Sequence, residues 1–287
     1  MQPCRTLAIA HPMYYVIDQN YFRAEELKDL VGQRPELNFV IPDIALLEMC
    51  KGDSWLETMR SSLTTLSACP ERVFHSMAVG EALNFELEHL TSVGGRLLPD
   101  EFRDFIRSVL CDIRDGTEVA GIAVIAGQIK EAQQDIRDKE LHHEQNALSL
   151  KTRKDIVEEA LKGDALKALK NRKITAQERL DLIRRIAKEI LSELLKRSGR
   201  NDAEISAFLK TEPLLLRFGY LSVRHALEWA TKGGLDSFPA EKVTNDVLDQ
   251  DYVAIASFFD GLLTKDTRVQ EAYEDLCELL AQDPNHE

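Results

Sequence analysis

The sequence predicts an α/β protein with a three-layer α/β/α arrangement around a parallel sheet, interrupted by an all-helical insertion. Two observations predict this fold. Strand-like and helix-like stretches alternate at both ends of the 287-residue chain, whereas residues 97–232 show long helical patterns and no convincing strand. Alternating strands and helices are typical of parallel sheets joined by right-handed crossovers.

The N-terminal part carries the first alternation. Short runs rich in aromatic and β-branched residues predict strands at 13–18, 37–42 and 71–76. An amphipathic run predicts a helix over 22–32, ending at Gly32, and the apolar stretch IALLEM predicts another that begins near Asp43. Pro42 stops the second strand.

The central block changes to long helices. We expect them at 99–113, 117–148 and 174–199. Thr175 stands three residues before Glu178, which predicts a capping box at the start of the last of these helices. We therefore expect one sheet domain built from residues 1–95 and 236–287, with residues 96–235 as a helical insertion.

The C-terminal part restores the alternation. The stretch DQDYVAIASFFDGLLTKD at 249–266 contains the end of an alanine-rich helix and a short buried strand, GLLT. A closing helix is predicted over 267–282. Acidic residues stand before the alanine-rich segment and after the strand, and their placement requires an explanation.

Charge is unevenly distributed along the chain. The formal net charge of −13 argues against a simple electrostatic nucleic-acid binder. Residues 151–200, however, hold 15 Lys and Arg against 8 Asp and Glu, a net of +7. This segment is a solvated face with ion pairs, a contact for an acidic protein, or an RNA-facing surface. For the last reading the candidate RNA-binding residues are Lys151, Arg153, Lys154, Arg172, Lys173, Arg184 and Arg185.

The cysteines and the apolar runs indicate a cellular setting. Five cysteines are widely spaced and form no Cys-x-x-Cys pair, which favours a reducing compartment. The longest apolar run, at 119–127, is too short to span a bilayer. The N-terminal residues lack the features of a signal peptide. We therefore expect a soluble, cytoplasmic protein with no membrane partner.

Four acids fall at similar points of the predicted fold. Asp18 ends the first strand, Glu48 lies on the helix after the second, Asp249 lies on the late helix, and Asp266 follows the last strand. The carboxyl ends of parallel strands share one edge of the sheet, so these acids are expected to converge. Converging carboxylates repel one another unless a cation lies between them. Hard divalent ions such as Mg²⁺ or Mn²⁺ suit oxygen ligands and phosphoryl chemistry.

Three motifs that carry these acids resemble the PIN-domain nucleases, a family of metal-dependent RNases with a PIN-like, Rossmann-like α/β/α fold. They are VIDQN with Asp18 and Asn20, FVIPDIALLEM with Glu48, and DQDYVAIASFFDGLLTKD with Asp249, Thr264 and Asp266. The resemblance covers about half the chain and does not account for residues 97–232.

The resemblance implies a metal-dependent endoribonuclease that hydrolyses RNA phosphodiester bonds, with DNA as a remaining alternative. It implies Asp18, Glu48, Asp249 and Asp266 as catalytic metal ligands for Mg²⁺ or Mn²⁺, with Asp251 competing for the place of Asp249. Asn20 and Thr264 would orient a ligand or phosphate.

Other readings stay open. A catalytically weak or inactive PIN-like protein would serve as a helical interaction module, binding a protein partner or a second copy through the insertion. An aspartyl-phosphate phosphatase also places an Asp after the first strand, but it needs a second Asp where this chain has Asn20. His75 and His225 have no partner pattern and are interpreted as packing or surface residues.

Overall fold

The computed structural model describes residues 12–141, 164–171, 173–231 and 240–282, together with the single residues 155, 159 and 161. Its sheet consists of β1 (Met13–Ile17), β2 (Leu37–Ile41), β3 (Val73–His75) and β4 (Gly261–Leu263). The strands are parallel and lie in the order β3-β2-β1-β4. The predicted mixed α/β class and the parallel sheet are therefore confirmed, and the arrangement is compatible with α/β/α layering.

The crossovers after β1 and β2 follow the predicted pattern. Helix α1 (Glu25–Gln33) leads from β1 to β2, and α2 (Asp43–Met49) begins directly after Pro42. Two further helices, α3 (Trp55–Leu63) and α4 (Val79–His89), flank β3. The sequence prediction did not identify α3 or α4.

The helices of the central block are α5 (Asp100–Asp115), α6 (Gly121–Leu141), α8 (Asp164–Lys170), α9 (Ala176–Arg197), α10 (Asp202–Leu209) and α11 (Leu214–Thr231). The capping box of Thr175 and Glu178 at the start of α9 is confirmed. The described residues between 97 and 232 contain no strand, as predicted.

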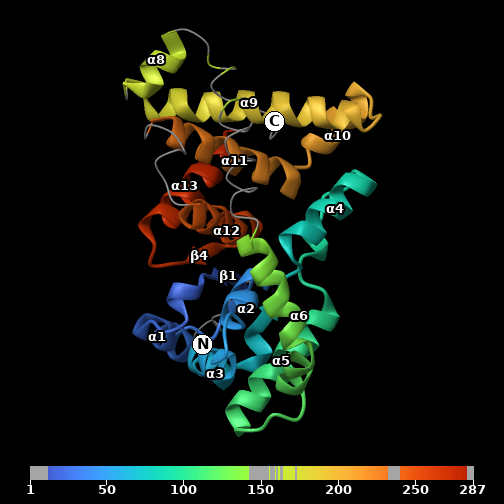
Figure 1. Cartoon of the computed structure of the whole chain (residues 1–287), viewed down its shortest axis with the longest axis vertical. Helices are drawn as coiled ribbons and strands as arrows, with labels where there is room; N and C mark the ends of the chain where they lie inside the picture. The colour runs from blue at the N-terminus through green and yellow to red at the C-terminus, as the bar shows by residue number, and fades with distance from the viewer. Residues whose placement is uncertain are drawn as a thin grey trace, which may run out of the picture.

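These helices lie on both sides of the sheet elements. Figure 1 shows α5 and α6 at one end of the molecule, beside α2 and α3, and α9 to α11 at the other. Helix α5 contacts β3, whereas α11 contacts α4, α9 and the C-terminal helices. One continuous apolar core joins the sheet to α9 and α11. The division into a sheet domain and one helical insertion therefore stays a prediction.

The C-terminal helices complete the fold around β4. Helix α12 (Ala240–Ala256) contacts both β1 and β4, and α13 (Thr267–Ala281) follows β4 directly. The small side chains of Ala254 and Ala256 are fully buried, as expected where a helix packs closely on a sheet. This packing brings the end of the chain to the carboxyl edge of β1.

Candidate functional site

The end of β1 meets the loop after β4. The backbone N–H of Asp18 donates to the carbonyl of Leu263 at 3.0 Å, which extends the pairing of β1 with β4 by one step. Asp18 is only 5% exposed to solvent. Parallel pairing therefore places a buried carboxylate beside residues 264–266, as the sequence predicted.

Two predicted orienting residues hold the Asp18 carboxylate. Its Oδ2 accepts hydrogen bonds from the Thr264 hydroxyl at 2.5 Å and from Asn20 Nδ2 at 2.8 Å. Asn20 Oδ1 accepts from the backbone N–H of Lys265 at 2.8 Å, and Thr264 Oγ1 accepts from that of Asp266 at 3.0 Å. Asn20 and Thr264 thus orient an acid and join the two loops.

Glu48 reaches the same region from α2. Its Oε2 accepts a hydrogen bond of 2.5 Å from the hydroxyl of Tyr252, which lies on α12 and is 1% exposed. Tyr252 is three residues after Asp249, so both face the same side of α12. We call Asp18, Asn20, Glu48, Tyr252, Thr264 and Asp266 the acid site.

Burial and nearby negative charges raise the pKa values of the acid-site residues Asp18, Glu48 and Tyr252. Burial raises the pKa of Asp18, and the nearby charge of Asp266 raises it further, against the hydrogen bonds that lower it. Burial also raises the pKa of Glu48, and the charge of Asp18 adds to that rise. Burial, with the charges of Glu48, Asp18 and Asp249, raises the pKa of Tyr252 well above its ordinary value. Asp18 is therefore linked electrostatically to Glu48 and to Asp266, whereas the charge of Asp249 acts on Tyr252.

The acids do not form one compact ligand cluster. Within the described ranges, no three His, Cys, Asp or Glu residues are placed to hold one ion together. Asp266 caps α13, since its Oδ1 accepts from the backbone N–H groups of Arg268 and Val269. Asp251 lines a separate hollow with Asp43, beside α2 and the start of α4. Asp251 and Asp249 thus line different hollows, and the choice between them as a metal ligand stays a prediction.

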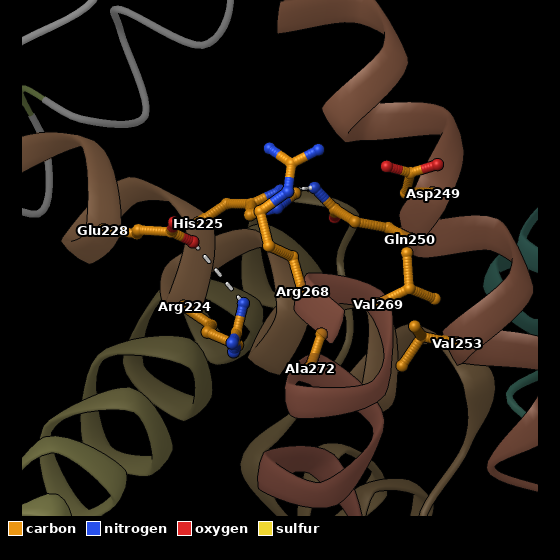
Figure 2. Close-up of a pocket in the computed structure, with 9 residues that line it drawn as sticks. All are labelled: Arg224, His225, Glu228, Asp249, Gln250, Val253, Arg268, Val269 and Ala272. Carbon is orange, nitrogen blue, oxygen red and sulfur yellow. Dashed lines mark hydrogen bonds and ion pairs between the residues drawn. The ribbon is translucent and has the colours of Figure 1, made fainter. Parts of the chain in front are cut away.

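Asp249 also lines a small hollow next to the acid site (Figure 2), enclosed by α11, α12 and α13. Arg224, His225 and Glu228 project from α11, and Arg268 projects from the first turn of α13.

The groups of this hollow also bind one another. Arg224 pairs with Asp275 at 2.6 Å and with Glu228 at 3.6 Å, and His225 is hydrogen-bonded to Gln250. The guanidinium groups of Arg224 and Arg268 thus belong to the same hollow as Asp249.

The predicted RNA-binding residues have different surroundings. Lys173 and Arg185 are exposed, and Arg185 lies 3.7 Å from Glu189. Arg184 is turned to the interior of the fold, where it contacts Asp181 and the carbonyl of Leu279. Lys151, Arg153, Lys154 and Arg172 lie outside the described residues.

Sequence reasoning missed two neighbours of the acid site. Tyr252 holds Glu48, and its i, i+3 spacing from Asp249 was the available signal. Arg268 stands two residues after Asp266, but a basic residue at that distance has no motif of its own. Only the packing of α13 against α11 and α12 places Arg268 in the hollow.

The donor set of the acid site suits a hard divalent cation. Asp18 and Glu48 offer carboxylate oxygens from different elements, and burial raises the pKa of each, because it disfavours an uncompensated anion. Mg²⁺ commonly keeps several waters and binds through one or two carboxylates. Two protein ligands supplemented by water therefore fit Mg²⁺ or Mn²⁺ better than a closed cage of protein ligands would.

No protein family model matches the chain, and no curated protein or solved structure is significantly similar to it. The likeness to PIN-domain nucleases thus stands on the motifs. Among the described residues, no helix combines the length and the apolar character needed to cross a bilayer.

Proposed function

We propose that the protein is a PIN-like α/β/α nuclease that hydrolyses RNA phosphodiester bonds with Mg²⁺ or Mn²⁺ bound at the acid site. One observation carries the proposal. The buried carboxylate of Asp18 and the partly buried carboxylate of Glu48 lie beyond the carboxyl ends of parallel strands, and the charge of Asp18 acts on Glu48. The side-chain donors that hold them, Thr264, Asn20 and Tyr252, are all neutral. A cation would relieve their mutual repulsion.

The residues of the acid site and of the hollow beside it would have different roles in the reaction. Asp18 and Glu48 hold the cation, while Tyr252 and Thr264 fix the rotamers of these two carboxylates. Arg268, in the hollow beside the site, would contact a phosphate of the substrate. When bound, the divalent ion would lower the pKa of water and stabilise negative charge on the phosphate.

The acidic chain would approach RNA through local basic groups. The guanidinium group of Arg268 lies near the acid site, and Lys173 and Arg185 are exposed at the α9 end of the molecule. Phosphate contacts of this kind bind RNA independently of its sequence and weaken as salt rises. The proposal therefore requires that the rate of RNA cleavage decreases when salt is added, as well as when a chelator removes the metal ion.

Cleavage of labelled single-stranded and structured RNA tests the proposal, with Mn²⁺, with Mg²⁺ and with chelator. Because a metal ion contributes several kcal/mol to transition-state stabilisation, Asp18→Asn and Glu48→Gln should each reduce cleavage by at least about 100-fold. Glu271→Gln changes an exposed acid on α13 and is the matched control. Equal cleavage by all four proteins would contradict the proposal.

Metal binding gives a second readout that needs no substrate. Mn²⁺ should raise the melting temperature of the wild-type protein and of Glu271→Gln, because a ligand that binds only the folded state stabilises it. It should leave Asp18→Asn nearly unchanged. Metal binding without cleavage of any RNA would show that the site is formed but that the substrate is of another class, with DNA tested next.

One observation favours the interaction-module reading as a second candidate. An apolar groove runs between α9 and α11, and the exposed side chains of Ile190 and Leu194 lie on its rim together with the partly buried Phe218. A folded protein that neither binds Mn²⁺ nor cleaves RNA would make this function the better account, with the groove as the surface to mutate.

A further inference from the structure

Another hollow lies between α2, α5 and α6. We call it the His75 pocket. Its volume of about 460 Å³ lies in the size range of small-molecule sites. Its lining residues include Leu46, Phe102, Phe105 and Ile125. Figure 1 shows the three helices at the same end of the molecule.

The spacing along α2 separates the pocket from the acid site. Asp43, Leu46, Leu47 and Cys50 line the pocket at i, i+3, i+4 and i+7, which is one helical face. Glu48 lies away from that face and binds Tyr252. The pocket is therefore a separate feature, and its ligand does not depend on the proposed nuclease activity.

The polar atoms of the pocket are chiefly acceptors. His75 ends β3 and is 6% exposed, and its Nδ1 lies 3.0 Å from the carbonyl oxygen of Ile41. A ring nitrogen at a carbonyl oxygen must carry the proton, so in the neutral ring Nε2 is an acceptor. Nε2 lies 3.9 Å from Asp43 Oδ1, so two acceptors face each other across a gap that one N–H donor group can bridge.

Charge and aromatic surface favour a cation. Asp43 and Glu101 both line the pocket, and its described lining includes no Lys or Arg. The rings of Phe102 and Phe105 lie 5.3 Å and 6.1 Å from the His75 ring. Aromatic faces attract ammonium groups, and the effect is stronger where water is excluded. An anion would meet the carboxylates of Asp43 and Glu101, and the described lining offers it no Lys or Arg.

From these contacts we infer that the His75 pocket binds a small organic amine with an aromatic or aliphatic body. The ammonium group donates to His75 Nε2 and Asp43, and the apolar body lies against Phe102, Phe105 and the side chains of α6. The ligand is a primary amine because that group is compact enough to reach both acceptors and carries three donors.

Binding of three matched probes tests this inference by calorimetry at neutral pH. 2-Phenylethylamine carries the ammonium group, 2-phenylethanol is a neutral analogue of similar size, and phenylacetate is an anion. The amine should bind at least about tenfold more tightly than the alcohol, which corresponds to one good charge-assisted hydrogen bond. Phenylacetate should not bind.

Variants of the lining residues separate the pocket from the rest of the surface. Asp43→Asn should weaken amine binding about tenfold, and Val124→Trp should abolish it by filling the pocket from an exposed position on α6. Asp104→Asn changes an exposed acid on α5 outside the lining and should bind the amine normally. Melting curves of each variant check that the fold is kept.

The pH dependence sharpens the test. Burial lowers the pKa of His75 below its ordinary value. The hydrogen bond to the Ile41 carbonyl and the charge of Asp43 act in the opposite direction but do not cancel this effect. As the pH falls through this pKa, His75 becomes cationic, loses its acceptor and repels the amine. Asp43, Glu101 and the Cys50 thiol are the other titratable groups of the lining; burial raises the pKa of Cys50 to about 11, so the thiol stays neutral.

The amine should therefore bind more weakly at a pH below the lowered pKa of His75 than at neutral pH. No binding of the amine by the wild-type protein at millimolar concentration would overturn the inference. Equal affinity for amine and alcohol, or unchanged affinity in Val124→Trp, would overturn it as well.

Discussion

Glu86 and Asp18 are both buried carboxylates, but their neighbours differ in kind. Glu86, on α4, is fully buried, and its oxygens accept from the backbone N–H groups of Val93 and Leu214 at 2.9 Å and of Leu215 at 2.7 Å. It therefore caps the start of α11 from a distant part of the chain.

The Oδ2 atom of Asp18 accepts hydrogen bonds from uncharged side chains, and other acidic residues lie near Asp18. Thr264 and Asn20 supply those donors, and the charges of Asp266 and Glu48 act in the same region. Burial raises the pKa of both Asp18 and Glu86, but the charge of Arg217 opposes the rise only at Glu86. Glu86 thus holds two distant parts of the fold together, whereas Asp18 is the acid to which we assign the proposed cation.

The largest expected difference is in stability, measured with matched acid-to-amide substitutions. Glu86→Gln replaces an acceptor with an NH₂ group and leaves at least one buried backbone N–H without a partner, which costs about 2 kcal/mol. Asp18→Asn keeps an acceptor for Thr264 and removes a charge that other acids repel, so its free energy of unfolding should be unchanged or higher. Urea unfolding at neutral pH measures both, and equal destabilisation would remove the distinction.

A change at Tyr252 should have an intermediate effect, on activity. Tyr252→Phe removes the donor to Glu48, and loss of such an outer partner typically costs about 10-fold or more. That hydrogen bond lowers the pKa of Glu48 against its burial, so the acid limb of the cleavage profile should move to higher pH in the variant. Tyr273→Phe, on α13, is the matched control and should leave the limb in place. If the acid limb of the cleavage profile stayed at the same pH in Tyr252→Phe, the hydrogen bond from Tyr252 would not control the ionisation of Glu48.

The smallest expected effect is the pH dependence of the Asp18→Asn stability difference. The folded state holds the Asp18 proton above the ordinary pKa of 3.8, so protonation stabilises the fold at low pH and this contribution is lost as the pH rises through the folded pKa. The asparagine variant cannot ionise. Its advantage near neutrality should vanish below pH 4, where the ordinary carboxyl is protonated as well.

Melting curves of both proteins between pH 4 and pH 8 measure this difference. Glu271→Gln should run parallel to the wild-type protein over the same range. If the stability of Asp18→Asn relative to the wild-type protein increased as the pH fell, the pKa of Asp18 would be lowered in the folded protein and not raised.

Local patterns fixed the elements and the order of the motifs. The strand before Asp18, the strand stopped by Pro42 and the capping box of Thr175 lie where they were predicted. Each depends on residues within one or two turns of chain, where periodicity and capping are directly visible in the sequence. The resemblance to PIN-domain nucleases singled out Asn20 and Thr264, and the structure places both beside Asp18.

Tertiary packing decided what the acids and helices contact. Glu86 binds the start of α11, 128 residues away, and Asp249 and Asp251 line different hollows although they are two residues apart. His75 lines a pocket because α5 and α6 pack at the β3 end of the sheet. Such contacts join buried faces that are distant in sequence, and many pairings of those faces are compatible with the same local pattern. The sequence by itself therefore determined which acids follow the strands, and only the packed core decided which of them share a site.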